Sequence, residues 1–464
     1  MPLVDTIKSF FRTPSPSSRP WSPLFFHPTK RVRLLTAPHI PLEEEFLLPS
    51  PAPYSSSSAS ASADTDTATA KLLLNRYFPI TIGALIPPSS QRFQVIGKLG
   101  FGRTSTVWLA RDFSRREYAA LKVLTHTASY PPAHTAGPAG ERAVLQRLRQ
   151  LDTLRAAASA VAAEAPSGRE CLRVAAEEFA LQDGRGRVKV LVEQPMAESW
   201  REKAARLGKE GRRMDMQEVK RGMRAVVRGL VYLHETAGIV HTDISSGNIF
   251  ISIGDPSTLD AFLSRELADP SPRKPLPDYT VYTSRPIPPS TRTLLHPPAV
   301  LLGDFGSACF IERPLVHGAQ PRVYRAPEVV LGVPWGVGVD VWSVGLVAWF
   351  MVTGKHLFPR PTGAGTGDEA HDAEEHIRDI ISVLGMPPAG MWDNRFFTEK
   401  GEWKGTLALK PRSKTLRDLV SGVKGEEKEE FLEFVKMALV WDPKERATAR
   451  KLLDSAWLHG VGDK

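Results

Sequence analysis

The chain has 464 residues, and its 60 Lys and Arg outnumber its 51 Asp and Glu to give a formal charge of +9. Hydrophobic residues make up 42%, which excludes a wholly disordered protein. A single core stops growing near about 250–300 residues, so we expect a large or two-lobed unit with tails. Only Cys171 and Cys309 occur, which excludes a disulfide-stapled or cysteine-ligated metal scaffold. No apolar run approaches about 20 residues, so we expect no membrane span.

The N-terminal part has the composition of a tail. Residues 1–40 are basic and interrupted by prolines, which predicts a disordered segment rather than a long amphipathic helix. A transit peptide shares the basic bias, and residues 30–33 would suit a nuclear signal, although such short runs are often accidental. Residues 41–91 form a leader, and its segment 49–70 is almost entirely Ser, Ala, Pro and Thr, which does not bury enough apolar surface to become ordered.

Strand patterns begin after the leader. Short β-branched and apolar runs separated by glycine or charged turns predict strands at 93–96, 105–110, 118–124 and 188–193. Residues 125–140 have the composition of a loop. Helical spacing of Val144, Leu145 and Leu148 predicts a helix over 141–151.

Helical patterns dominate the second half. Apolar positions between Val219 and Leu233 fit one buried helix face, and 339–352 is apolar enough for a buried helix. Residues 255–300 are rich in Pro, Ser and Arg and predict an inserted loop. The fold class expected is therefore α+β, with a small β-rich lobe at 92–196 and a larger helical lobe at 197–460.

The first motif that carries chemistry is rich in glycine. It runs Gly97-Lys98-Leu99-Gly100-Phe101-Gly102-Arg103-Thr104-Ser105-Thr106-Val107. Glycines in a hairpin let the backbone approach phosphate oxygens closely, because no Cβ intervenes. An ordinary glycine-rich hairpin is the alternative, since Ser105 replaces the third glycine. A dinucleotide-binding loop is disfavoured because a strand rather than a helix follows.

A lysine follows the glycine-rich motif in a strand. Lys122 ends the run Ala119-Ala120-Leu121-Lys122, and a lysine in an apolar strand is costly unless it meets an anion. The alternative is an edge-strand lysine that reaches solvent. The predicted helix at 141–151 offers Glu141 as an ion-pair partner.

Two further motifs complete the pattern. His241-Thr242-Asp243-Ile244-Ser245-Ser246-Gly247-Asn248 places Asp243 to accept a hydroxyl proton and Asn248 to hold a metal. Asp304-Phe305-Gly306 adds a second metal-binding carboxylate, and such oxygen ligands suit Mg²⁺. All four motifs occur in this order before Ala326-Pro327-Glu328 and the segment 340–345. Together they predict phosphoryl transfer from ATP.

These motifs give the chain a family resemblance. Over residues 92–460 it resembles a eukaryotic protein kinase, and more closely the serine/arginine-protein kinase family of the CMGC group, in its fungal branch. The resemblance rests on the segments 98–112, 241–243, 305–309 and 324–328, and on 43–49 and 76–83 in the leader.

The resemblance implies a role for each matched residue. The catalytic residues would be Asp243 as base, with Lys122, Asn248 and Asp304, of which Asn248 and Asp304 hold Mg²⁺. ATP would be bound by Leu99, Gly100, Phe101, Gly102, Arg103, Thr104, Ser105, Val107, Ala120, Lys122, Glu141 and Glu193. Glu328 and Arg446 would form a structural ion pair, and the roles of Asp340, Leu145, His241 and Phe305 would also be structural.

The sequence departs from the family pattern at three positions. Ser245 stands at the position where the family typically has a lysine that touches the γ-phosphate. Pro321 stands at the position of the threonine that usually bonds to that lysine. The lost contact would cost on the order of 10²-fold or more in rate. Thr242 replaces the arginine that binds an activation-loop phosphate. Between Asp304 and Glu328 the only hydroxyls belong to Ser307 and Tyr324, so we expect an activation loop that needs no phosphorylation.

The resemblance also implies a partner, a protein substrate rich in Arg and Ser. The acidic segment 367–375 is the best local docking candidate, and the acidic start of a helix is the alternative explanation. We expect a monomer in the cytoplasm or nucleus, with a mitochondrial signal less favoured and no direct contact with nucleic acid or membrane. A nucleotide-binding pseudokinase scaffold and a small-molecule phosphotransferase remain rival hypotheses.

Overall fold

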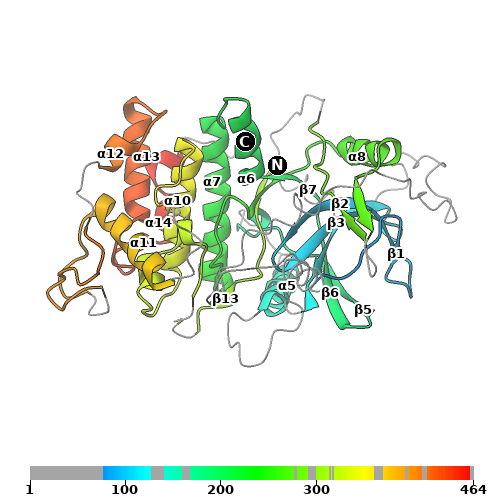
Figure 1. Cartoon of the computed structure of the whole chain (residues 1–464), viewed down its shortest axis with the longest axis horizontal. Helices are drawn as coiled ribbons and strands as arrows, with labels where there is room; N and C mark the ends of the chain where they lie inside the picture. The colour runs from blue at the N-terminus through cyan, green and yellow to red at the C-terminus, as the bar shows by residue number, and fades with distance from the viewer. Residues whose placement is uncertain are drawn as a thin grey trace, which may run out of the picture. The chain divides into compact units, whose positions relative to one another are not determined.

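The computed structural model describes residues 77–126, 140–158, 168–275, 280–290, 299–312, 315, 318–359, 369–391, 396–409 and 415–459. They divide into two compact units (Figure 1). Unit 1 holds the described residues of 1–136, 174–198 and 252–298, and unit 2 those of 137–173, 199–251 and 299–464. The predicted tail, the segment 49–70 and most of the loop predicted at 125–140 lie outside the described residues.

Unit 1 is built on one antiparallel sheet with the strand order β1-β2-β3-β4-β6-β5. The strands are β1 (Leu85–Ile86), β2 (Phe93–Gly102), β3 (Ser105–Asp112), β4 (Glu117–Leu124), β5 (Glu177–Asp183) and β6 (Gly186–Glu193). Alternate residues of a strand point to opposite faces. One face carries a large buried cluster that includes Trp108, Leu121 and Val190. The opposite face of the sheet carries a second cluster of buried hydrophobic residues and the candidate nucleotide-binding residues.

The insert between the catalytic motif and Asp304 is more regular than the sequence suggested. It contains helix α8 (Ser257–Ala268) and a two-stranded ribbon of β10 (Arg273–Pro275) and β11 (Thr280–Tyr282). The prediction of a loop was therefore wrong for much of 255–300. Leu259, Phe262 and Leu263 recur at helical spacing and are buried against the sheet of unit 1. The sequence did not predict this helix because many prolines surround its short apolar stripe.

Unit 2 is mainly helical, as predicted. Its longer helices are α5 (Gly140–Ala158), α6 (Trp200–Lys209), α7 (Met216–Val231), α10 (Gly338–Thr353), α11 (Glu369–Leu384) and α13 (Gly425–Ala438). Its shorter helices are η2 (Arg169–Cys171), η3 (Tyr232–Ala237), η4 (Arg322–Tyr324), α9 (Pro327–Val330), α12 (Leu416–Leu419), α14 (Ala449–Leu453) and α15 (Ala456–His459). Asp215 caps α7 by accepting a hydrogen bond from Glu218 N, and α7 buries its predicted apolar face. No helix among the described residues is both long and apolar enough to cross a membrane.

Two short strand pairs and one isolated bridge lie near the catalytic motifs of unit 2. Residues of β9 (Ile249–Ser252) pair with β12 (Val300–Leu302), and β8 (Ile239–Val240) pairs with β13 (Cys309–Phe310). Leu172 forms an isolated bridge with Leu302. These pairings bring the segment that follows Asn248 beside the segment that precedes Asp304.

A buried ion pair holds the C-terminal part of unit 2 to the segment before α10, as the sequence predicted. Arg446 Nη1 lies 2.7 Å from Glu328 Oε1, and both side chains are almost fully buried. The guanidinium also donates to the carbonyl oxygens of Gly338 and Val440. Every charge in this pair is therefore compensated, which is what burial of an ion pair requires.

Replacing Arg446 tests this arrangement. We expect Arg446→Met to lower the free energy of unfolding by roughly 3–5 kcal/mol, because it leaves the Glu328 carboxylate buried without its cation. Arg450→Met, which removes an exposed pair with Glu235, is a matched control and should cost less than about 1 kcal/mol. Urea denaturation of both variants measures the difference, and equal losses would contradict the account.

Candidate active site

Four residues of the predicted nucleotide site share one face of the sheet of unit 1. Val107 on β3 pairs with Lys122 on β4, and Ala120 pairs with Glu193 on β6. Cross-strand partners point to the same face, and residues two apart on one strand do so too. Val107, Ala120, Lys122 and Glu193 therefore lie on one surface. Lys122 is only 6% exposed.

The glycine-rich motif forms the predicted hairpin. Gly102 of β2 pairs with Ser105 of β3, so Arg103 and Thr104 form the exposed turn between them. A Cβ added at Gly100 or Gly102 would meet no atom within 4 Å, so the backbone there is open to an approaching phosphate. Ser105, which replaces the third glycine, is buried within the strand.

The catalytic motif of unit 2 is a compact loop joined by its own side chains. Asn248 Nδ2 donates to the carbonyl oxygen of Asp243 at 2.8 Å and to its carboxylate Oδ2 at 2.9 Å. These two bonds leave the side-chain oxygen of Asn248 as the atom available for a metal. Asp243 is half-buried, which suits a group that must meet a substrate hydroxyl.

The buried ring of His241 holds this loop in place through two hydrogen bonds. Its Nδ1 accepts a hydrogen bond from Asp243 N, so the ring proton is on Nε2, which donates to Gly303 O at 3.1 Å. Its ring lies 5.3 Å from the ring of Phe305. His241 and Phe305 are both almost fully buried, in agreement with the structural roles predicted for them.

Asp304 is brought beside the catalytic loop by the β9–β12 pairing. Gly303 N donates to Asn248 O at 2.9 Å. Because Gly303 immediately precedes Asp304 in the chain, this hydrogen bond places Asp304 close to Asn248. Asp304 has a positive φ of 65°, a conformation that costs energy for a residue with a Cβ. The Asn248 amide oxygen and the Asp304 carboxylate are hard oxygen donors of the kind that Mg²⁺ prefers, so the residues present fit this ion.

Lys122 and Glu141, predicted to pair, belong to different units. Lys122 lies on β4 of unit 1, whereas Glu141 lies in the first turn of α5 in unit 2. Within unit 2 the Glu141 carboxylate lies near Gly306, where an added Cβ would be 3.9 Å from Oε2. The ion pair stays a prediction.

The structure adds residues that the motif analysis did not assign to the site. Tyr324 Oη and Ser246 Oγ are 3.3 Å apart, which links the activation segment to the catalytic loop. Burial raises the pKa of Tyr324. The sequence signal that could have identified Tyr324 as a site residue is its position in the Tyr-Arg-Ala-Pro-Glu segment. Burial also raises the pKa of Cys309 to about 12, so its thiol is inert at neutral pH.

Comparison with known proteins identifies the fold. The protein kinase domain model matches residues 93–289 and 290–458. The chain is 30% identical over 390 residues to a serine/threonine protein kinase of Aspergillus fumigatus, covering 82% of this chain and 87% of the relative. It is 26% identical over 409 residues to the serine/threonine-protein kinase SRPK of Physarum polycephalum, covering 83% and 89%. With the protein kinase dsk1 of Schizosaccharomyces pombe the identity is 24% over 479 residues, covering 83% and 84%.

The chain therefore belongs to the protein kinase domain family, which uses ATP and a divalent metal ion. More closely, it is a serine/threonine protein kinase similar to those named SRPK and dsk1. The resemblance, the two-lobed α+β fold and the class of enzyme predicted from the sequence are confirmed. The roles of individual site residues stay predictions.

Ser245 offers a direct test of the missing lysine. We expect Ser245→Lys to raise kcat between about 10- and 100-fold, because it would supply a cation for charge that develops on the transferred phosphoryl group. Ser245→Met has a similar length without charge and is the matched control. Steady-state transfer rates compare the two variants. A lysine variant no faster than the methionine variant would contradict this assignment.

Proposed function

We propose that this kinase transfers the γ-phosphoryl group of ATP, with Mg²⁺, to serine in Arg/Ser-rich protein segments, and that it needs no activation-loop phosphorylation. It would act as a monomer in the cytoplasm or nucleus. The observation that carries the proposal is the loop in which Asn248 is hydrogen-bonded to Asp243 and lies beside the segment of Asp304. The proposed base and the two proposed metal ligands would thus be held in one unit.

The chemistry follows from these side chains. Asp243 would accept the proton of the substrate hydroxyl, and the Asn248 amide that donates to its Oδ2 would fix the orientation of the carboxylate. Mg²⁺ bound by Asn248 and Asp304 would neutralise charge on the phosphates. Lys122, buried on the sheet face of unit 1, would bind the phosphates of ATP.

The named relatives support a basic substrate, and the candidate docking segment does not add to that support. The relatives named SRPK and dsk1 match over most of this chain. In α11, Asp372 and Glu375 form ion pairs with the guanidinium of Arg322, the shorter at 2.8 Å. These two carboxylates are therefore already paired with an arginine of this chain, which does not support their use as a docking surface. Glu374 instead has a structural role, because it is buried and accepts hydrogen bonds from Thr406 and Leu407.

Neutral hydrogen bonds in the activation segment support independence from phosphorylation. Thr242 Oγ1 donates to Ser307 O at 2.7 Å, at the position where many kinases carry a phosphate-binding arginine. Gln320 Nε2 donates to Val339 O and to Ser343 Oγ, and Gln320 Oε1 accepts from Ala326 N. These bonds fix both ends of the segment without a phosphate.

A nucleotide-binding scaffold is the alternative function. Ser245 and Pro321 favour it, because both members of a usual contact to the transferred phosphate are replaced. The hydrogen-bonded pair of Asp243 and Asn248 opposes it, since a scaffold has no need of an oriented base. Transfer activity separates the two functions.

The test is Mg²⁺-dependent transfer of labelled phosphate from ATP to an Arg-Ser repeat peptide. We expect transfer by the wild type and a loss of at least about 10³-fold in Asp304→Asn, because the metal ligand is weakened. Phosphatase-treated enzyme should keep its rate.

Each part of the proposal has its own contradicting outcome. ATP binding without transfer would favour the scaffold. Transfer to a Lys-Ser repeat peptide at an equal rate would contradict the substrate class, because lysine matches the charge of arginine without its forked geometry. A large loss of activity after phosphatase treatment would contradict the independence of the activation loop.

A further inference from the structure

The glycine-rich strand lies at an edge of its sheet. On the side away from β3, β2 pairs with β1 only at Phe93 and Gln94. Among the described residues no strand pairs with β2 on that side beyond this point. The register with β3 is also irregular between Val95 and Gly97 and again between Lys98 and Gly100. An edge strand with two bulges needs support from elsewhere to hold one conformation.

Helix α8 of the insert supports this strand on one face. The ring of Phe262 is fully buried and lies so close to Gly97 that an added Cβ would be 2.8 Å from Cε1. Leu99, a predicted nucleotide contact, packs on the same cluster as Phe262 and Leu263. Gly97 is therefore needed for the close approach of helix and strand.

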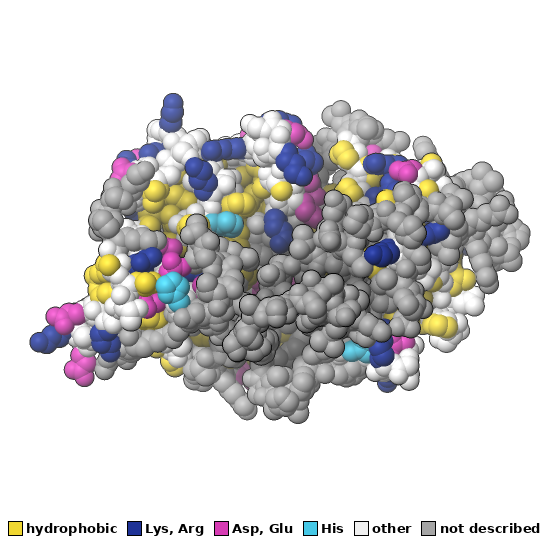
Figure 2. All heavy atoms as spheres, viewed as in Figure 1, with side chains coloured by type: hydrophobic (Ala, Val, Ile, Leu, Met, Phe, Trp, Pro, Cys, Tyr) yellow, Lys and Arg dark blue, Asp and Glu magenta, His cyan; other side chains and the backbone are white. Residues whose placement is uncertain are grey.

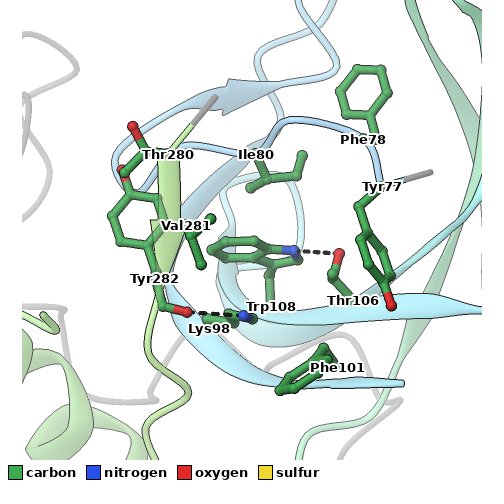
Figure 3. Close-up of a pocket in the computed structure, with 10 residues that line it drawn as sticks. All are labelled: Tyr77, Phe78, Ile80, Lys98, Phe101, Thr106, Trp108, Thr280, Val281 and Tyr282. Carbon is green, nitrogen blue, oxygen red and sulfur yellow. Dashed lines mark hydrogen bonds between the residues drawn. The ribbon is translucent and has the colours of Figure 1, made fainter. Parts of the chain in front are cut away.

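The segment after α8 supports the strand on its other face and along its edge. Lys98 Nζ donates to Tyr282 O at 2.9 Å (Figure 3). Arg285 N donates to Lys98 O at 2.8 Å. Tyr282 packs edge-on against Trp108 of β3, with ring centroids 5.9 Å apart. Lys98, although cationic, is only 6% exposed. The insert thus wraps around β2 where the glycine-rich motif begins.

The leader holds the far end of the hairpin. Tyr77 Oη donates to Gly102 O at 2.8 Å, next to the exposed turn. In Figure 3, Tyr77, Phe101, Thr106 and Tyr282 surround a small hollow, whose volume is about 40 Å³. The hollow holds a few waters at most, so the three segments are already packed together.

We propose that the insert and Tyr77 form a brace that positions the glycine-rich hairpin for ATP, with Phe262, Arg285 and Tyr77 as positioning residues. This inference rests on the proposed role of the hairpin in ATP binding. Ordering a glycine-rich strand costs conformational entropy, and a brace meets that cost before ATP arrives. ATP then binds a hairpin that already has its bound conformation.

The first test removes the backbone bond to the strand. Arg285→Pro lacks the N–H that donates to Lys98 O, whereas Arg285→Ala keeps it. Both variants lose the side-chain pair with Glu266, so each is the other's control for that loss. The dissociation constant of a fluorescent ATP analogue should be about three- to tenfold higher in the proline variant. Equal affinities in two folded variants would overturn the proposal.

The second test does not depend on a proline. Gly97→Ala places a methyl group against Phe262 and should weaken ATP binding by a similar factor. Adding Phe262→Leu makes room and should restore most of the affinity. A double variant that binds as weakly as the single one would contradict the brace, because the loss would then come from the glycine itself.

Hydrogen exchange provides a readout without nucleotide or catalysis. We expect faster exchange of the amides of residues 98–102 in Tyr77→Phe than in the wild type. Ser382→Ala is the control, because it loses one hydroxyl bond, to Asp379 O, within α11 of unit 2 and outside the brace. Unchanged exchange in Tyr77→Phe would remove Tyr77 from the brace. ATP binding without phosphate transfer would contradict the proposed function and leave the brace intact, so the two failures are distinguishable.

Discussion

The geometry of the catalytic loop depends on one buried carboxylate. Asp340, in the first turn of α10, has no exposed surface and accepts hydrogen bonds from the backbone N–H groups of His241 and Thr242 at 2.7 and 2.8 Å. His234 Nε2 lies 2.9 Å from the same carboxylate. A buried charge is tolerated because all its partners are donors. The helix therefore fixes the two residues that immediately precede Asp243.

That fixation makes an unfavourable backbone conformation possible. Thr242 has a φ of 66°, and Asp304 and Gln320 have similar positive values. Each such residue costs of order 1–3 kcal/mol and persists only where its surroundings determine it. Thr242 is held by Asp340 and Ser307, and Gln320 by Val339 and Ser343. Among the described residues, three of the five non-glycine residues with a positive φ thus lie in the catalytic loop, at the predicted metal ligand and in the activation segment, and the other two, Gln91 and Arg116, lie in unit 1.

The sequence predicted the chemical motifs well because each one is local. Asn248, five residues after Asp243, donates a hydrogen bond to its carboxylate, whereas the long-range Glu328–Arg446 pair was expected only from the family resemblance. The support of the hairpin was not predictable, because Arg285 acts through its backbone N–H and Tyr282 through its carbonyl oxygen. Backbone groups leave no signature in residue type. The helix in the insert was missed because prolines surround its short apolar stripe.

The central claim is that Asp340 orients the catalytic loop. The measurement that tests it most directly is the single-turnover transfer rate of Asp340→Asn, alongside ATP affinity and circular dichroism. An amide presents one acceptor where the carboxylate presents two, so one backbone N–H would face an NH₂ group. The account predicts a folded protein that still binds ATP and transfers phosphate on the order of 10²-fold more slowly, because Asp243 is misplaced. A folded variant with the wild-type rate would contradict it.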